Sequence, residues 1–283
     1  MSDAPARPIW LCADDYGISR AVNGAIRDLV LRRRINATSV MVVAPSFDRS
    51  EAAPLGLLNA GAARVAIGLH VTLTAPFVPL SPGFKPLQDG AFPPLEDMLR
   101  RALMRRLSRK RLEVEIATQF RAFVNAFGRV PDFIDGHQHV HQFPQVRDAL
   151  LKVVKEVAPD AWVRQCGRAP MSLLQRFADK KALLLDVLSR AFRRRAAALG
   201  IATNPAFAGT YDFAAQDVPD FAALFPAFLD RLPAGGLVMC HPGKVDAELQ
   251  RLDPLTVQRE REYAYLAGDS FPTVLKSHGM ALA

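Results

Sequence analysis

Short apolar runs alternate with longer amphipathic segments along most of the chain. An apolar run of four to six residues rich in Val, Ile and Leu is typical of a buried strand. Such runs predict strands at residues 9–13, 37–43, 65–69, 133–135, 161–164 and 236–240. Apolar residues at helical spacing predict helices over residues 19–33, 95–107, 112–127, 144–157, 172–199, 221–231 and 254–267.

The alternation of strands and helices predicts an α/β fold with a mostly parallel sheet and helices outside it. Six or seven strands fit an irregular or incomplete (β/α) barrel, and a doubly wound sheet is the alternative. The chain has 283 residues, half of them hydrophobic, which is enough for residues 1–283 to form one domain with a full core. We expect the Pro- and Gly-rich loop near 76–94 and the basic segments near 95–112 and 171–203 to shape a substrate cleft.

Four of the apolar runs lead directly into polar residues that can bind a metal ion. These residues are Asp14, Asp15, His70, Asp135, His137 and His241. In α/β folds the functional site lies at the carboxyl ends of the strands. The six side chains are therefore expected to converge, which favours a hydrolytic metal site.

Asp14 and Asp15 stand side by side at the end of the first predicted strand. Successive side chains of a strand alternate in direction, so one carboxylate can bind a metal ion while the other handles protons. The alternative is that both only cap the following helix.

A second cluster contains Asp135 and three alternate histidines, His137, His139 and His141. In an extended backbone all four would lie on one face, and some of the histidines would lie beside the metal rather than bind it. Two imidazoles and one carboxylate with open positions form a common catalytic metal site.

Asp15, His70 and His137 supply such a set. His241 follows the last predicted strand and can protonate a leaving group there. Arg164 and Arg168 are candidates for lying beside the metal ligands or for binding substrate hydroxyl groups or an acetyl oxygen, with a plain surface role as the alternative.

The formal net charge is +8, and the excess is local to two segments, residues 100–111 and 190–195. We favour solvated helix faces for both, because no aromatic interleaving or nucleic-acid-binding motif accompanies the charge. Peripheral contact with a membrane that carries the substrate is a second interpretation. We expect no nucleic-acid partner.

The three cysteines are odd in number and far apart, which is not the pattern of a disulfide framework. The N-terminal residues contain no apolar segment of the signal-peptide type, and no apolar run approaches the length of a membrane-spanning helix. We therefore expect a cytoplasmic protein in a reducing compartment.

Four motifs taken together resemble the YdjC-like carbohydrate deacetylases, the family of the chitooligosaccharide and hopanoid-associated deacetylases. They are ADDYG, GLHVTL, DGHQHVHQFP and MCHPG, which lie between residues 13 and 243 in the order typical of that family. AVNGAI and residues 259–263 are also similar to it. The resemblance implies a distorted (β/α) barrel that removes an N-linked acetyl group from an amino sugar.

Position by position, the resemblance implies that Asp14 is the general base and that Asp15, His70 and His137 bind one divalent metal ion, magnesium or zinc. It implies that His241 protonates the leaving amine. Asp135, His139 and His141 would lie near the metal. Members of the family often pair, so a homodimer is one expectation, and the substrate would be an N-acetylated sugar or glycolipid.

Two other classes of function stay open at this point. The first is another metal-dependent barrel hydrolase, a phosphoesterase or an amidohydrolase of cyclic amides, which usually needs more ligands and often a second metal. The second is a non-catalytic sugar-binding protein on the same scaffold. The presence of Asp14 and of all three ligand candidates disfavours the second class.

Overall fold

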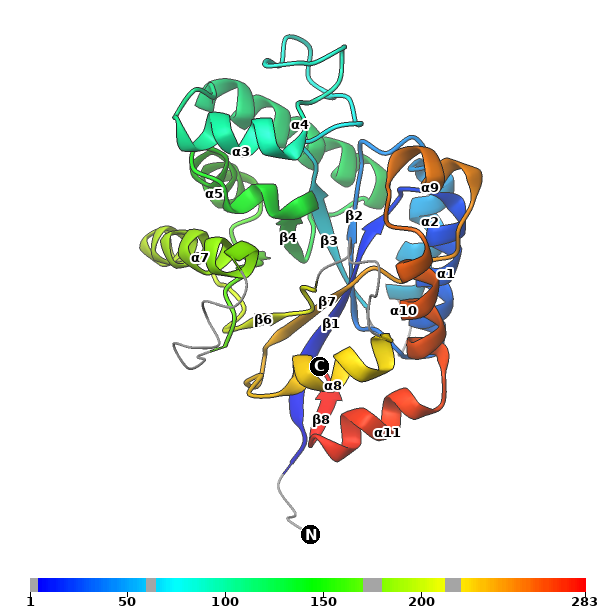
Figure 1. Cartoon of the computed structure of the whole chain (residues 1–283). Helices are drawn as coiled ribbons and strands as arrows, with labels where there is room; N and C mark the ends of the chain where they lie inside the picture. Colours follow the sequence, from blue (N-terminus) through cyan, green and yellow to red (C-terminus); the bar gives the residue numbers. More distant parts are fainter. Residues whose placement is uncertain (1–4, 60–64, 170–179, 212–219) are drawn as a thin grey trace.

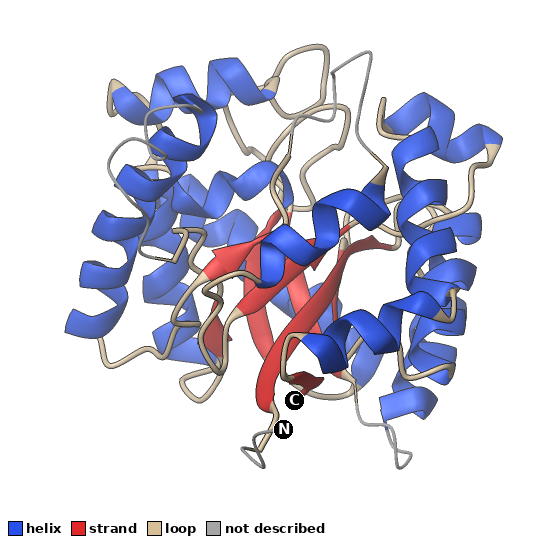
Figure 2. Ribbon diagram, turned by 60° about the horizontal axis from the view of Figure 1, so that its bottom comes forward, coloured by secondary structure: helices blue, strands red, loops and turns tan. Residues whose placement is uncertain are grey.

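A curved parallel sheet forms the centre of the molecule, and helices surround it (Figures 1 and 2). The computed structural model describes residues 5–59, 65–169, 180–211 and 220–283. The strand order is β5-β4-β3-β2-β1-β7-β6, and β8 pairs in parallel with the start of β1. The strands are β1 (Arg7–Tyr16), β2 (Ala37–Val40), β3 (Ala66–Val71), β4 (Phe133–Gly136), β5 (Trp162–Val163), β6 (Phe207–Ala208), β7 (Leu237–Cys240) and β8 (Met280–Leu282).

The helices cover the outside of the sheet (Figure 2). They are α1 (Arg20–Leu31), α2 (Arg49–Asn59), α3 (Leu95–Leu103), α4 (Arg109–Phe127), the 3₁₀ helix η1 (His137–Gln142), α5 (Val146–Val157), α7 (Lys180–Ala198), α8 (Phe221–Leu229), α9 (Ala247–Leu252), α10 (Val257–Ala267) and α11 (Ser270–Ser277). β5 and β6 lie at opposite edges of the sheet order. The open, incomplete barrel predicted from the sequence is therefore confirmed.

Elements with a clear periodicity were predicted close to their actual bounds. The helix that begins after Ser19 is one of them, because the Ser19 side chain accepts a hydrogen bond from the Val22 amide and caps α1. The two short strands β6 and β8 and the helices α2, α9 and α11 are absent from the prediction. Two or three residues are too few to show a period, and α2 buries only Ala52 and Leu55 around an internal proline. The expected helix over 172–199 is described from Lys180 onward, and residues 170–179 lie outside the described part.

None of the described helices combines the length and the apolar character that a membrane span requires.

Gly68 lets the middle of the sheet pack closely against an aromatic cluster. A Cβ atom at this position would lie 2.5 Å from two ring atoms of Phe133. That ring is fully buried and stacks on Trp162 with centroids 4.5 Å apart, so it cannot move aside. The strand β3, which carries His70, therefore depends on a glycine two residues earlier.

We expect Gly68→Ala to lower the free energy of unfolding by roughly 1–3 kcal/mol, because the added methyl group overpacks the core. Gly24→Ala is the matched control, since nothing lies within 4 Å of a Cβ atom there. That change should raise stability by roughly 0.5–1 kcal/mol, because alanine favours the helix. Urea unfolding measures both variants, and equal stability of the two would contradict the packing argument.

Candidate metal centre

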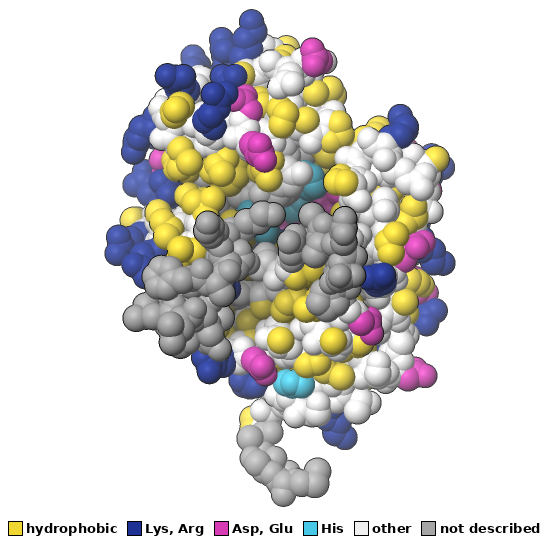
Figure 3. Space-filling model, in the orientation of Figure 1, with side chains coloured by type: hydrophobic (Ala, Val, Ile, Leu, Met, Phe, Trp, Pro, Cys, Tyr) yellow, Lys and Arg dark blue, Asp and Glu magenta, His cyan; other side chains and the backbone are white. Residues whose placement is uncertain are grey.

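The polar residues predicted at the strand ends do converge at the carboxyl edge of the sheet. Ala13 of β1 pairs in register with Cys240 of β7, and His70 of β3 pairs with Asp135 of β4. These registers place the end of β7 beside β1 and the end of β3 beside β4. In Figure 3 histidine side chains are visible in a hollow near the middle of the face shown.

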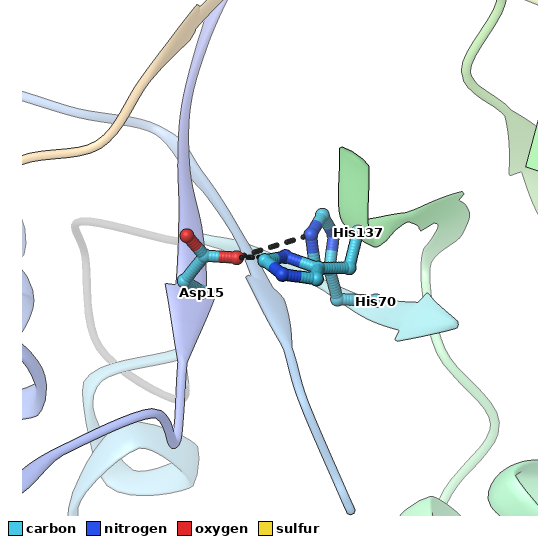
Figure 4. A group of neighbouring side chains, drawn as sticks. All are labelled: Asp15, His70 and His137. Carbon is cyan, nitrogen blue, oxygen red and sulfur yellow. Dashed lines mark hydrogen bonds and ion pairs between the residues drawn. The ribbon is translucent and has the colours of Figure 1, made fainter. Parts of the chain in front are cut away.

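Asp15, His70 and His137 form the centre of the site (Figure 4). Asp15 Oδ1 lies 3.2 Å from His70 Nε2 and 3.0 Å from His137 Nδ1. One ligand atom from each of the three residues lies within 4.8 Å of the other two, and all three side chains are buried. Three donors from three different strands or strand ends thus face one point.

A bulge in β1 brings both aspartates into this site. The pairing of β1 with β2 shifts between Ala13 and Tyr16, and Asp15 has a φ of 67°. Asp15 reaches Nε2 of His70, while Asp14 lies 3.4 Å from Ser39 Oγ, which contacts Nδ1 of the same imidazole. The expectation of simple strand alternation for the two carboxylates was therefore wrong. A left-handed residue interrupts the alternation.

The histidine cluster also departs from the extended backbone that its spacing suggested. β4 ends at Gly136, and η1 follows with positive φ angles of 53° at Gln138 and 58° at His139. Only His137 reaches Asp15. His139 Nδ1 lies 3.5 Å from Cys166 Sγ, and His141 Nε2 lies 3.0 Å from the Arg164 carbonyl oxygen. The prediction of one common face was wrong because the chain turns twice within the motif.

Asp135 supports His70 from behind. Its Oδ1 lies 2.6 Å from His70 Nδ1, which leaves Nε2 directed toward Asp15. A carboxylate on one ring nitrogen fixes the tautomer and orientation of an imidazole whose other nitrogen binds a metal ion.

Arg164 is fully buried between two carboxylates. Its Nη1 and Nη2 atoms donate hydrogen bonds of 2.6 Å to the two oxygens of Asp14, and Nη2 lies 2.5 Å from Asp135 Oδ2. Full burial excludes a surface role for Arg164. A place beside the candidate metal ligands, one of the roles expected for this residue, fits its contacts with Asp14 and Asp135. Arg168 is paired with Asp186, 2.8 Å from its Nη2.

Two functional neighbours from α10, Arg259 and Glu262, were not among the candidates. Arg259 Nη2 donates a 2.6 Å hydrogen bond to Asp15 Oδ2 and lies 2.8 Å from Asp253 Oδ2. Glu262 accepts hydrogen bonds from the His241 amide and, at 2.6 Å, from the Tyr211 hydroxyl. Arg259 and Glu262 both lie within residues 259–263, the segment that resembles the YdjC-like family, and their spacing of three residues puts both on one helical face.

The protonation states follow from burial and from these pairs. Burial raises the pKa of Asp14, but Arg164 outweighs it and holds that pKa well below its usual value. Burial acts in the same direction on Asp15, and there Arg259 lowers the pKa well below its usual value. Burial lowers the pKa of His70, yet Asp135 and Asp15 raise it to about 10 overall. Burial lowers the pKa of His241.

The donor set fits a divalent cation. Three aspartates and two arginines leave the buried cluster with one excess negative charge before any histidine is counted. A carboxylate and two imidazoles suit zinc, cobalt or manganese at least as well as magnesium. A bound cation would take the place of the proton on His70, because a ligand imidazole must be neutral.

Comparison with known proteins agrees with the motifs. A sequence model of the YdjC-like protein family matches residues 8–277, nearly the whole chain. The chain belongs to this family. The resemblance expected from the four motifs is thus confirmed.

Two named relatives and one solved structure are similar to the chain over about half to nearly all of its length. The chitooligosaccharide deacetylase of Serratia marcescens is 28% identical over 249 residues, which cover 84% of this chain and 82% of that protein. The chitooligosaccharide deacetylase of Escherichia fergusonii is 30% identical over 139 residues, which cover 47% of this chain and 50% of that protein. A crystal structure from Enterococcus faecalis, described as a cellobiose-phosphate cleavage protein, superposes with a TM-score of 0.72 at 20% identity and covers 98% of this chain and 97% of that one. The last likeness shows the fold.

Glu262 provides a test of the electrostatics of the site. Burial raises the pKa of this carboxyl group from 4.5 to about 7. At a pH between these two pKa values, the carboxyl group of residue 262 is ionised in the unfolded chain and protonated in the folded chain. The free energy of unfolding therefore falls as the pH rises through this range, by ~3 kcal/mol in total. We expect Glu262→Gln to lack this part of the pH dependence.

Urea unfolding of wild type and variant at several pH values between 4.5 and 7 measures the difference. Glu260→Gln on the same helix is the control for loss of one acidic side chain, because Glu260 is exposed. Parallel stability curves for wild type and Glu262→Gln would show that Glu262 does not titrate in this range.

Proposed function

We propose that the protein is a metal-dependent hydrolase that removes the N-acetyl group from an amino sugar. The observation that carries the proposal is the buried group of Asp15, His70 and His137 beside an arginine-bound Asp14. The names of the relatives in the YdjC-like family, chitooligosaccharide deacetylase and carbohydrate deacetylase, support the substrate class.

Asp15 Oδ1, His70 Nε2 and His137 Nδ1 are the atoms that would hold the metal ion. The ion would supply a water of lowered pKa and a positive charge that polarises the acetyl carbonyl and stabilises the oxyanion.

Asp14 is the proton acceptor in this proposal. Arg164 keeps its carboxylate ionised at neutral pH and fixes both of its oxygens. It therefore stays in one orientation while it accepts a proton from the attacking water.

His241 is the proton donor to the departing amine. It follows β7 directly, and because Cys240 pairs with Ala13, it lies beside the end of β1. Burial and the charge of Arg259 lower the pKa of His241 overall, while the negative charges of Asp15 and Asp14 act in the opposite direction. Glu262 holds the backbone amide of His241 and thereby fixes the position of the donor.

A two-metal phosphoesterase fits the arrangement less well. Among the described residues, the other group that could converge on a cation consists of Cys12, Asp14 and Asp135. The guanidinium group of Arg164 binds all three of these side chains. A cation at that point would have to displace a buried positive charge.

We expect Asp14→Asn to lower turnover by roughly 10²–10⁴-fold and to leave metal content unchanged, because the residue transfers a proton and is not a ligand. The measurement is acetate release with defined divalent metals from chitobiose, longer chitooligosaccharides and a GlcNAc glycolipid. Release that persists at the wild-type rate in Asp14→Asn would remove Asp14 from the role of base.

His70→Ala, in contrast, should lose the metal, because it removes one of the three donors. Metal per chain after dialysis, measured by elemental analysis, checks this, with Asp14→Asn as the matched control. Full metal occupancy in His70→Ala would exclude His70 from the ligand set. Two metals per wild-type chain would favour the phosphoesterase class instead.

A further inference from the structure

The positive charge of the protein is concentrated in two helical segments. Residues 95–112 contain seven basic and two acidic residues, and α7 contains six basic and one acidic residue. Each segment therefore carries +5, whereas the whole chain carries +8. The rest of the chain is slightly negative, so the excess positive charge belongs to these two segments alone.

The connection between α3 and α4, which we call the α3–α4 corner (residues 103–111), exposes apolar side chains among unpaired cations. Leu103 and Met104 are 53% and 55% exposed, and together with Leu99 they line a shallow apolar depression. Nearby carboxylates pair with Arg100, Arg101 and Arg109. The exposed cations of the corner that form no ion pair with any described residue are Arg105, Arg106, Lys110 and Arg111.

The α3–α4 corner and α7 adjoin each other across the start of α5. The Gln145 side chain bonds with both the amide and the carbonyl group of Leu107, and Asp148, three residues later, lies 3.9 Å from Arg195 of α7. Figure 1 shows α3, α5 and α7 along the same side of the molecule. Lys and Arg side chains border that side in Figure 3, with hydrophobic side chains next to them.

α7 repeats the combination of apolar and cationic groups. Val187 is 61% exposed and Leu184 is 38% exposed. The exposed Arg190, Arg193 and Arg194 form no ion pair with any residue in the described part of the chain. Two adjoining segments thus present the same chemistry to solvent.

We propose that the α3–α4 corner and α7 form a docking surface for an anionic phospholipid bilayer. Cationic side chains gain from the negative surface of such a bilayer, and apolar side chains between them gain from the acyl boundary. Nucleic acid is the less suitable partner, because residues 95–111 contain no aromatic side chain on which bases could stack. The surface does not depend on the proposed deacetylase activity.

Flotation with phosphatidylcholine vesicles, with and without phosphatidylglycerol, tests the proposal on the full chain. We expect binding to the phosphatidylglycerol vesicles only, and weaker binding as salt screens the charges. The triple variant Arg106→Glu, Lys110→Glu and Arg111→Glu should lower the partition coefficient between vesicles and solution by at least about tenfold. Leu103→Gln with Met104→Gln should lower the partition coefficient independently, since it removes the apolar contact and leaves the charge unchanged.

The matched control is Arg49→Glu with Arg251→Glu and Lys276→Glu, three exposed residues on α2, α9 and α11. It changes the net charge by the same amount on other helices and should keep wild-type binding. Circular dichroism shows that each variant is folded. If the control loses as much vesicle binding as the Arg106, Lys110 and Arg111 variant, or if the Leu103 and Met104 variant binds as well as wild type, net charge alone explains the binding. Either result would overturn the proposal. Binding to RNA oligonucleotides with none to vesicles would overturn it as well.

Discussion

The site depends on how three carboxylates can be buried together at one end of a sheet. An ionised carboxylate loses several kcal/mol of hydration when it is buried, and only close partners can offset that loss. Arg164 compensates Asp14 and Asp135, and Arg259 compensates Asp15. Both arginines are fully buried themselves. Arg164 directly follows β5, and Arg259 lies on α10. These two elements therefore supply the positive charges that the buried carboxylates require.

This balance also divides the two oxygens of Asp15, and those of Asp135, between two partners. Asp15 gives one oxygen to Arg259 and directs the other to the imidazoles, and Asp135 gives one to Arg164 and one to His70. An imidazole held in this way has little freedom to rotate. The site is therefore preorganised by contacts among its own residues, and the cation would find its donors already oriented.

The sequence predicted the barrel and the convergence of the strand ends, because apolar runs and the geometry of parallel sheets are local or general properties. It named Asp135 and Arg164 as residues near the site, but it did not predict which side chains they contact, and it did not name Arg259 or Glu262 as candidates. Arg259 and Asp15 are in contact although they are 244 residues apart in the chain, and a pattern of hydrophobic and polar residues cannot predict a contact over such a separation. The predicted alternation of side chains along a strand is interrupted at Asp15 and at His139. Both have positive φ angles, and because neither residue is a glycine, the sequence does not indicate these turns.

The left-handed conformation of Asp15 has a consequence for evolution. An aspartate at a φ of 67° costs roughly 1–2 kcal/mol, which a glycine would not incur. A glycine would nevertheless deprive the buried Arg259 of the Asp15 carboxylate, and breaking a buried ion pair costs more than this backbone strain. The ion pair therefore keeps aspartate in a conformation that glycine would adopt more easily. Positions 15 and 259 lie 244 residues apart in the chain, yet a descendant that loses one of the two charges must also change the other.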